Sequence, residues 1–340
     1  LNSNTPIEIA AQFNSLDALQ IYLHHPLVNL NSKNKDGQTC LHISAGNDYV
    51  EFVRLLIENE MIQQRLSDSK GRMPIHIAAE NGHVDVVDLF LTKGAVTVNA
   101  RTDYGATPLH MALNSGDLTM IEYLLDVDGV DAEAKTLTYE TPLHCAAENR
   151  RSKAVHLLLV RGNVDPNPQD KDGWTPLHYA TQNSDVDTIE VLLSSDKTKI
   201  NIKNAMGLTP LHLAAKMANS EIVNLLLNCP EKEVDINTCD KDGWTALHFA
   251  AKSGNSEVIN SILAFDGQSK VNINAPDNAG WTPLHDAVKY QNHEIVEILL
   301  QQSGINVNAE TKSKWVPLHI AYLNHDQTTK VLLESMPGIL

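Results

Sequence analysis

The stretch DKDGWTALHFAA at residues 240–251 carries the signal that decides the fold, because its central four-residue word recurs along the whole chain. The word is Thr-Pro-Leu-His in five copies, and the variants keep at least two of those four residues. The ten copies begin at Thr5, Thr39, Met73, Thr107, Thr141, Thr175, Thr209, Thr245, Thr282 and Val316. Most starts lie 34 residues apart, as at 107, 141, 175 and 209, and two spacings are 36 and 37. Such a fixed period predicts a solenoid of stacked units, not the two or three globular domains that 340 residues would otherwise suggest.

Each copy predicts two short helices and an extended finger. Thr is a good helix N-cap, and Pro at the first helical position removes no hydrogen bond. The Ala-rich turn that follows, as at 211–215, lets two helices approach closely. A second helix then carries apolar residues at helical spacing, as at 86–91. An alternating stretch such as 271–275 and a tight Asp242-Gly243 turn complete the copy as a hairpin-like finger.

The segments at 240–251 and 170–180 (DKDGWTPLHYA) closely resemble the ankyrin repeat, and this resemblance extends over essentially the whole chain. It implies an all-α solenoid with β-hairpin-like fingers, an elongated and curved array of L-shaped units. The tetratricopeptide family shares the 34-residue period but lacks the Thr-Pro-Leu-His word and the finger. In the ankyrin family, fingers and first helices line the concave face, where partners usually bind. Residues 1–340 are then expected to form one domain, with repeats at approximately 1–33, 34–67, 68–101, 102–135, 136–169, 170–203, 204–239, 240–276, 277–310 and 311–340.

Composition narrows the partners and the compartment. With 26 Lys plus Arg and 42 Asp plus Glu, the net charge is −16, which disfavours nucleic acid and anionic membrane as partners. The chain contains no apolar run of the roughly 18–20 residues that a membrane-spanning helix needs. The four cysteines form no C-x-x-C pair and are expected to be reduced thiols. These features predict a cytoplasmic protein, with a secreted effector or toxin fragment as the alternative.

No catalytic residue, metal site or cofactor is expected. Nine of the fifteen histidines belong to the repeated word, and the ankyrin resemblance implies that they hydrogen-bond backbone between units. The other six are scattered and show no H-E-x-x-H or similar metal-ligand spacing. A nucleophile elbow, a phosphate-binding loop and a kinase signature are all absent from the sequence.

The tryptophans mark the candidate partner site. All four stand immediately before the word, and Leu208 fills the same position in the intervening repeat. Exposed Trp is typical of interface hot spots, although stacking of each ring on a neighbouring finger would serve only to stiffen the array. The turn after the first helix varies between these repeats, and Lys216, Lys252 and Lys289 form a basic line. That line suits an extended acidic peptide with apolar anchors, or it merely keeps the surface soluble. The predicted partner-binding residues are Trp174, Trp244, Trp281, Trp315, Gln182, Asn183, Lys216, Met217, Lys252, Ser253, Lys289 and Tyr290.

The resulting functional hypothesis is a non-catalytic scaffold that binds a protein or peptide on the concave face of the array. The alternative is the recognition arm of a larger enzyme, bacterial effector or toxin whose active domain lies outside these residues. Because the chain begins with Leu1 instead of Met, some truncation is expected, and the full gene would separate the two hypotheses. The partner's identity and the oligomeric state stay open.

Four substitutions and two insertions depart from the repeat and predict local differences. Glu8 replaces the histidine of the word in the first repeat. Lys330 replaces an apolar residue of the last second helix, which fits either a water-facing cap or a merely degenerate repeat. Tyr139 and Lys314 replace the glycine of the finger tip, so altered tips are expected there. The two long spacings place insertions near 228–233 and 264–270, which are expected to be exposed loops without a motif.

Overall fold

The structure, a computed structural model, describes residues 5–94, 96–230 and 232–339. The chain divides into two compact units, Leu1–Lys171 and Asp172–Leu340. The division falls at the beginning of the sixth repeat, so each unit contains five copies of the word. The assignment of residues 1–340 to a single domain stays a prediction.

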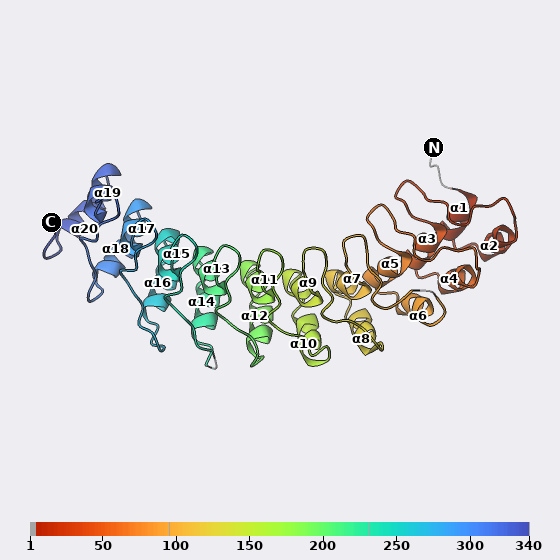
Figure 1. The fold of residues 1–340 in the computed structure, drawn as a ribbon. Helices are drawn as coiled ribbons and strands as arrows, with labels where there is room; N and C mark the ends of the chain where they lie inside the picture. Colours follow the sequence, from red (N-terminus) through yellow and green to blue (C-terminus); the bar gives the residue numbers. More distant parts are fainter. Residues whose placement is uncertain (1–4, 95, 231, 340) are drawn as a thin grey trace. The chain divides into compact units, whose positions relative to one another are not determined.

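Unit 1 contains the first five helix pairs. Its odd-numbered helices pack side by side in one row, and its even-numbered helices form a second row beside them (Figure 1). The helices are α1 (Pro6–Gln12), α2 (Leu16–Leu23), α3 (Cys40–Gly46), α4 (Val50–Ile57), α5 (Pro74–Glu80), α6 (Val84–Thr92), α7 (Pro108–Ser115), α8 (Leu118–Asp126), α9 (Pro142–Glu148) and α10 (Ser152–Val160).

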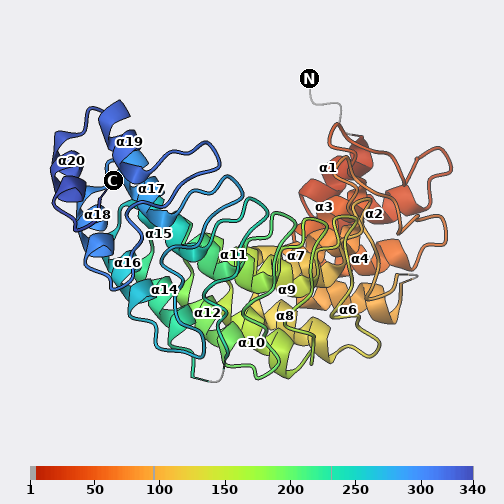
Figure 2. The same ribbon diagram turned by 60° about the vertical axis from the view of Figure 1, so that its left-hand side comes forward.

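Unit 2 repeats the same arrangement, and Figure 2 shows its finger loops running side by side. Its helices are α11 (Pro176–Gln182), α12 (Val186–Leu193), α13 (Pro210–Lys216), α14 (Ser220–Leu227), α15 (Ala246–Ser253), α16 (Ser256–Leu263), α17 (Pro283–Lys289), α18 (His293–Leu300), α19 (Pro317–Leu323) and α20 (Gln327–Glu334). No strand is assigned in the part of the chain that the structure describes. The all-α solenoid expected from the repeat is therefore confirmed.

The residues of the word cap the N-terminus of each first helix through a local network of hydrogen bonds. Helix α11 shows the complete network. The Thr175 hydroxyl accepts the backbone N–H of His178 at 3.4 Å and lies 2.7 Å from its Nδ1. The same Nδ1 accepts the backbone N–H of Thr175 at 3.1 Å. These bonds satisfy donors that a helix N-terminus leaves without a partner, and Pro176 needs none.

The core of each unit lies between its two rows of helices. Small residues such as Ala214 and Ala215 on α13 are fully buried, which lets neighbouring first helices approach closely. The second helices bury one apolar stripe, for example Ile222, Val223 and Leu226 on α14. This continuous burial of apolar surface between stacked repeats stabilises a fold in which no single repeat has a core of its own.

The fingers are closed by backbone turns and joined to one another. At one tip, Asp277 donates its N–H to the carbonyl of Trp281, and Asn278 donates to the carbonyl of Asp242 in the preceding finger. Asparagine side chains add a second connection that the sequence interpretation missed. Asn274 Nδ2 donates to the carbonyl of Gly304, and its Oδ1 accepts the N–H of Asn306 at 2.8 Å.

The expectation of altered finger tips at Tyr139 and Lys314 is wrong. Both residues take the left-handed conformation, with φ of 63° and 66°, and close the turn as the glycines do. At Lys314, for example, its N–H still donates to the carbonyl of Thr311. The backbone hydrogen bonds that join the fingers keep the turn in this shape. Each of the two residues therefore adopts a left-handed backbone conformation that costs roughly 1 kcal/mol relative to glycine.

The two terminal substitutions have clear structural roles. The Glu8 carboxylate accepts the backbone N–H of Thr5 at 3.0 Å and the hydroxyl of Ser32 at 2.9 Å, so it replaces the capping function of the histidine. Lys330 is half-buried, and its ammonium group lies 4.0 Å from the centroid of the Tyr322 ring. The cation is thus placed over an aromatic face at a position that other second helices fill with buried apolar residues.

The insertion loops are partly as expected. Residues 264–270 are mostly exposed, as are Asn228 and Pro230. Glu231 lies outside the described residues. The two loops border a cavity, which is described below.

Candidate functional site

All twelve predicted partner-binding residues belong to unit 2, where three of the tryptophans rest on their own repeats. Each ring is half-buried and lies beside the histidine of the word that follows it. Trp174 also contacts Tyr179 at a centroid distance of 5.3 Å, and Trp244 contacts Phe249 at 5.1 Å. Trp315 keeps 39% of its surface exposed. The rings therefore both brace their repeats and present a face to solvent.

Five of the predicted residues come together as an alternating series of rings and cations. The ammonium group of Lys252 lies 5.4 Å from the Trp244 ring centroid and 5.1 Å from that of Tyr290. The ammonium group of Lys289 lies 5.4 Å from Tyr290 and 4.8 Å from Trp281. The order is thus Trp244, Lys252, Tyr290, Lys289 and Trp281, which we call the aromatic–lysine ladder. Cation–π attraction of about 0.5–1 kcal/mol per exposed contact holds both lysines over the rings.

The cations of this ladder form no ion pair, although both interact electrostatically with the buried carboxyl of Asp286. Both lysines are exposed, and neither forms an ion pair with any carboxylate that the structure describes. Trp244 is fixed at the other end by its Nε1–H, which donates to the Asp277 carboxylate at 3.2 Å. Two available positive charges between anchored rings are what an acidic ligand with apolar groups would need.

Lys216 does not join the ladder, although the sequence placed it in the same basic line. Its repeat carries Leu208 at the tryptophan position, and the following repeat carries Ser253 where the next one has Tyr290. No aromatic ring therefore occupies either of the two positions at which Lys252 contacts one. Lys216 is exposed at the last position of α13, next to the C-cap residue Met217.

The remaining predicted residues are not gathered with the ladder by any described contact. Gln182 is exposed and Asn183 is half-buried after α11. The Ser253 hydroxyl donates to the carbonyl of Ala250 at 2.9 Å, which is a helix-end bond within its own repeat.

Asp286 is the residue near the ladder that the sequence interpretation missed. It follows the histidine of the word, where the other repeats carry an apolar or aromatic residue such as Tyr179 or Phe249. Only 1% of its surface is exposed, and its Oδ2 has no hydrogen-bond partner among the described residues. Burial and the charge of Asp277 raise the pKa of its carboxyl to about 7, although Lys289 and Lys252 pull it down. The signal that could have found it is a charged residue at a position that is otherwise apolar.

The histidines of the word are structural, as the resemblance implied. His212 Nε2 lies 3.0 Å from the carbonyl of Thr238 and 3.1 Å from that of Trp244 in the next repeat. Because Nδ1 accepts a backbone N–H, Nε2 carries the proton and donates it. Burial lowers the pKa of His212 to about 4, so the imidazole is neutral at pH 7. Equivalent bonds run from His42, His110, His178, His248 and His285 to the repeat that follows each, and His76 Nε2 bonds the carbonyl of Ala100 at the end of its own repeat.

Two kinds of feature are absent from the described residues. Residues 5–94, 96–230 and 232–339 contain no group of three His, Cys, Asp or Glu side chains placed to hold a metal ion. Over the same ranges, none of the helices has the length and apolar character required to cross a bilayer.

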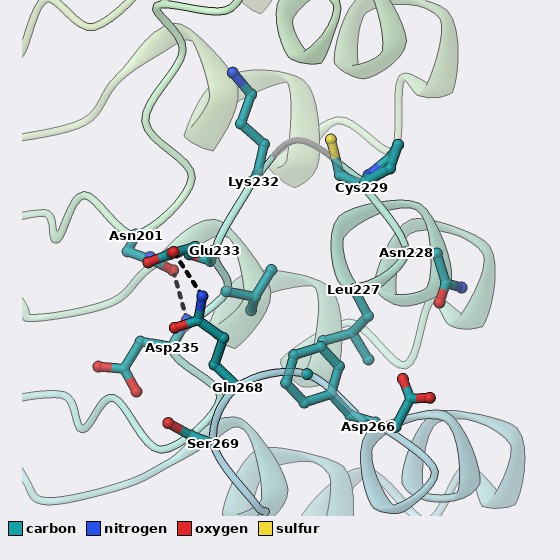
Figure 3. Close-up of a pocket in the computed structure, with 14 residues that line it drawn as sticks. Asn201, Leu227, Asn228, Cys229, Lys232, Glu233, Asp235, Asp266, Gln268 and Ser269 are labelled. Carbon is teal, nitrogen blue, oxygen red and sulfur yellow. Dashed lines mark hydrogen bonds between the residues drawn. The ribbon is translucent and has the colours of Figure 1, made fainter.

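A cavity of about 720 Å³ lies away from the ladder, between the two insertion loops (Figure 3). It follows the second helices α14 and α16, and Phe265 and Leu227 form its apolar part. Gln268 Nε2 donates to Glu233 Oε1 at 2.6 Å across it, and Asp235 N–H donates to Asn201 Oδ1 at 3.1 Å (Figure 3). None of the predicted partner-binding residues lines this cavity.

Comparison with known protein families identifies the repeat. The family model for three copies of ankyrin repeats matches residues 7–102, 60–136, 96–170, 143–238, 199–275, 232–311 and 269–339, which together cover nearly the whole chain. A search of curated proteins found no match to this sequence.

Proposed function

The chain belongs to the ankyrin repeat family, whose repeats generally act as protein–protein interaction modules, and from this premise we propose that it is a non-catalytic scaffold. We place the partner site in unit 2, on the tryptophan-bearing fingers and the turns after the first helices. In terms of the family's architecture, this is the concave face. The partner is a protein or peptide, and binding requires no cofactor or metal.

The aromatic–lysine ladder is the observation that carries this proposal. Its rings are anchored before a partner arrives, since each tryptophan rests on its own repeat. Little side-chain entropy is then lost on binding, which favours affinity. Two lysines without ion pairs supply local positive charge in a chain of net charge −16, beside the buried Asp286 and the Asp277 carboxylate that accepts the Trp244 N–H. Within a Debye length of about 8 Å this local charge prevails over the net charge of the molecule.

The partner chemistry that fits is an extended acidic segment with apolar side chains. Carboxylates would lie against Lys252 and Lys289, and apolar groups would contact Trp281, Tyr290 and the exposed Trp315. The spacing of the ladder along successive repeats calls for an extended backbone, because its five members come from two adjacent repeats.

Selection from a displayed peptide library, followed by titration of the winning peptides, tests the proposal. Winning peptides should be acidic, and Lys216, Lys252 and Lys289 reversed together to Glu should weaken binding at least tenfold at low salt. The wild-type affinity should itself fall as salt rises, while the circular dichroism of the variant stays unchanged. Replacing all four tryptophans by Ala should abolish binding of the selected peptides.

The matched control reverses charge in the early fingers of unit 1. Lys35 is exposed, so Lys35→Glu changes the net charge with little structural effect. Arg72 is a poorer control because it pairs with Asp68 and Glu80. If Lys35→Glu abolishes binding and the triple reversal in unit 2 does not, the site has been placed on the wrong unit.

A further inference from the structure

Unit 1 contains a pocket of about 300 Å³ in the place where repeats of unit 2 hold a tryptophan. We call it the Ala106 pocket. Ala106 occupies the tryptophan position of the fourth repeat, and His110 and Met111 follow in its helix word. In the sixth repeat the same three positions are Trp174, His178 and Tyr179, and the tryptophan ring packs on the other two at 5.8 and 5.3 Å. The small Ala106 leaves that volume empty.

The fifth repeat enlarges the vacancy. Its tryptophan position holds Glu140, and the residue after its histidine is Cys145, smaller than Tyr179 or Phe249. Leu137 and Tyr104 border the opening and expose 71% and 65% of their surfaces. The backbone bond from Leu137 N–H to the carbonyl of Tyr104, at 2.9 Å, fixes these two finger tips relative to each other. The pocket is therefore preformed, with apolar walls and apolar side chains at its mouth.

Polar groups at the pocket define what can enter. The Glu140 carboxylate lines it and accepts one hydrogen bond, from the Thr138 hydroxyl at 3.0 Å. No basic side chain in the described chain pairs with Glu140. Two basic residues also line the pocket. The Arg72 guanidinium is engaged by Asp68 and Glu80, and Lys70 is exposed on the third repeat, two repeats before Glu140. Burial raises the pKa of Glu148, and the nearby charges of Glu140 and Asp170 raise it further.

We propose that the Ala106 pocket is a second ligand site, which takes a tryptophan side chain from a partner segment with a basic residue next to that tryptophan. The indole replaces the ring that Ala106 lacks and packs on His110 and Met111. Its N–H donates to an oxygen acceptor of the wall, as Trp244 Nε1–H does to Asp277 in unit 2. The basic residue meets the Glu140 carboxylate. Filling a desolvated pocket with an aromatic anchor is the usual origin of an interface hot spot.

The test uses the whole chain with ¹³C-methyl methionine and follows the Met111 methyl signal by NMR, assigned from its loss in Met111→Leu. The probes are Ac-Trp-Arg-NH₂, Ac-Trp-Glu-NH₂ and Ac-Ala-Arg-NH₂. Ac-Trp-Arg-NH₂ should shift the Met111 signal saturably and bind at least fivefold more tightly than Ac-Trp-Glu-NH₂. Ac-Ala-Arg-NH₂ should cause no shift. Equal shifts from the Trp and Ala probes would overturn the proposal.

Two variants fill the pocket from within. Ala106→Trp restores the residue that four other repeats carry, and it should reduce binding of Ac-Trp-Arg-NH₂ at least tenfold. Ala106→Leu copies Leu208 of the seventh repeat, fills less volume and should cause a smaller loss even if the Trp variant folds poorly. Gln38→Trp, at the same position of the second repeat, is the matched control and should leave binding unchanged. Binding that survives both Ala106 variants would disprove the site.

Two further variants test the role of the Glu140 charge and the independence of the pocket from the proposed site in unit 2. Glu140→Gln should abolish the preference for Arg over Glu beside the tryptophan, and an unchanged preference would refute the role of Glu140. The triple Lys→Glu variant of unit 2 should leave the Met111 shifts unchanged. The Ala106 pocket and the proposed function of the aromatic–lysine ladder can thus fail independently of each other.

Discussion

The ammonium group of Lys289 lies 4.8 Å from the centroid of the Trp281 ring. This contact predicts a favourable coupling in a double-mutant cycle of Trp281→Leu and Lys289→Ala, of about 0.5–1 kcal/mol. Urea unfolding followed by circular dichroism measures it in all four proteins of the cycle. The control pair is Leu208 and Lys216, which occupy the same two positions without a ring, and Leu208→Ala with Lys216→Ala should show no coupling.

Acid should destabilise unit 2 through its buried histidines. Burial lowers the pKa of His212 from 6.5 to about 4, so the unfolded chain binds a proton at this residue more readily than the folded chain. The stability contribution is complete above pH 6.5 and is lost as the pH falls from 6.5 to 4, by at most about 1.4 kcal/mol per pH unit for each such histidine. All four tryptophans lie in unit 2, so their fluorescence during urea unfolding reports this unit within the whole chain.

His212→Gln provides the comparison for this pH dependence. It should lower stability at pH 8, because it disturbs the bonds to Thr238 and Trp244, and it should flatten the loss between pH 6.5 and 4. A pH profile as steep as that of the wild type would contradict the assignment of a neutral, buried His212.

Replacement of Asp286 should stabilise unit 2 at neutral and alkaline pH. Its carboxyl has a pKa raised from 3.8 to about 7, so the stability it contributes is complete below pH 3.8 and is lost as the pH rises through 7. Asp286→Leu places an apolar residue where most repeats have one and should raise the unfolding free energy at pH 8 by about 2 kcal/mol. Tryptophan-detected unfolding at pH 5 and pH 8 should show the larger gain at pH 8. An equal gain at both values would mean that the carboxylate is not the source.

Finger-tip substitutions should act in opposite directions at two positions of positive φ. Lys314, with φ of 66°, is strained, and Lys314→Gly should stabilise unit 2 by about 1 kcal/mol, because its surface pair with Glu310 contributes little. Gly207 has φ of 81°, and an added Cβ would lie 2.7 Å from the backbone nitrogen of Lys241. Gly207→Ala should therefore lower the urea midpoint, and a neutral effect would show that the neighbouring finger can move aside.

The asparagine connections between fingers should carry measurable stability. Asn274→Ala removes two hydrogen bonds to the next repeat, to the Gly304 carbonyl and from the Asn306 N–H, and should cost about 1–2 kcal/mol. Asn260→Ala on the exposed side of α16 is the control and should be nearly neutral. Equal effects of the two substitutions in tryptophan-detected unfolding would argue against the connection.

The sequence by itself determined the repeat, its helices and the role of the word. Thr, Pro and His specify the start of the first helix through contacts within four residues, so they act in the same way in every copy that carries them. The period and the apolar stripes then require the repeats to stack, because a single repeat cannot bury its own apolar face. The family and the all-α solenoid could therefore be predicted from residues alone.

Only the tertiary structure decided which side chains meet across repeats. Lys252 and Tyr290 lie 38 positions apart in the chain, yet stacking brings the cation over the ring, while Lys216 of the same predicted line has no ring to meet. The burial of Asp286 and the vacancy beside Ala106 depend likewise on the volumes of residues in neighbouring fingers and helices. The local sequence pattern determines the backbone hydrogen bonds within one repeat. Contacts between repeats depend on how side chains of different repeats pack, and the sequence of a single repeat does not specify that packing.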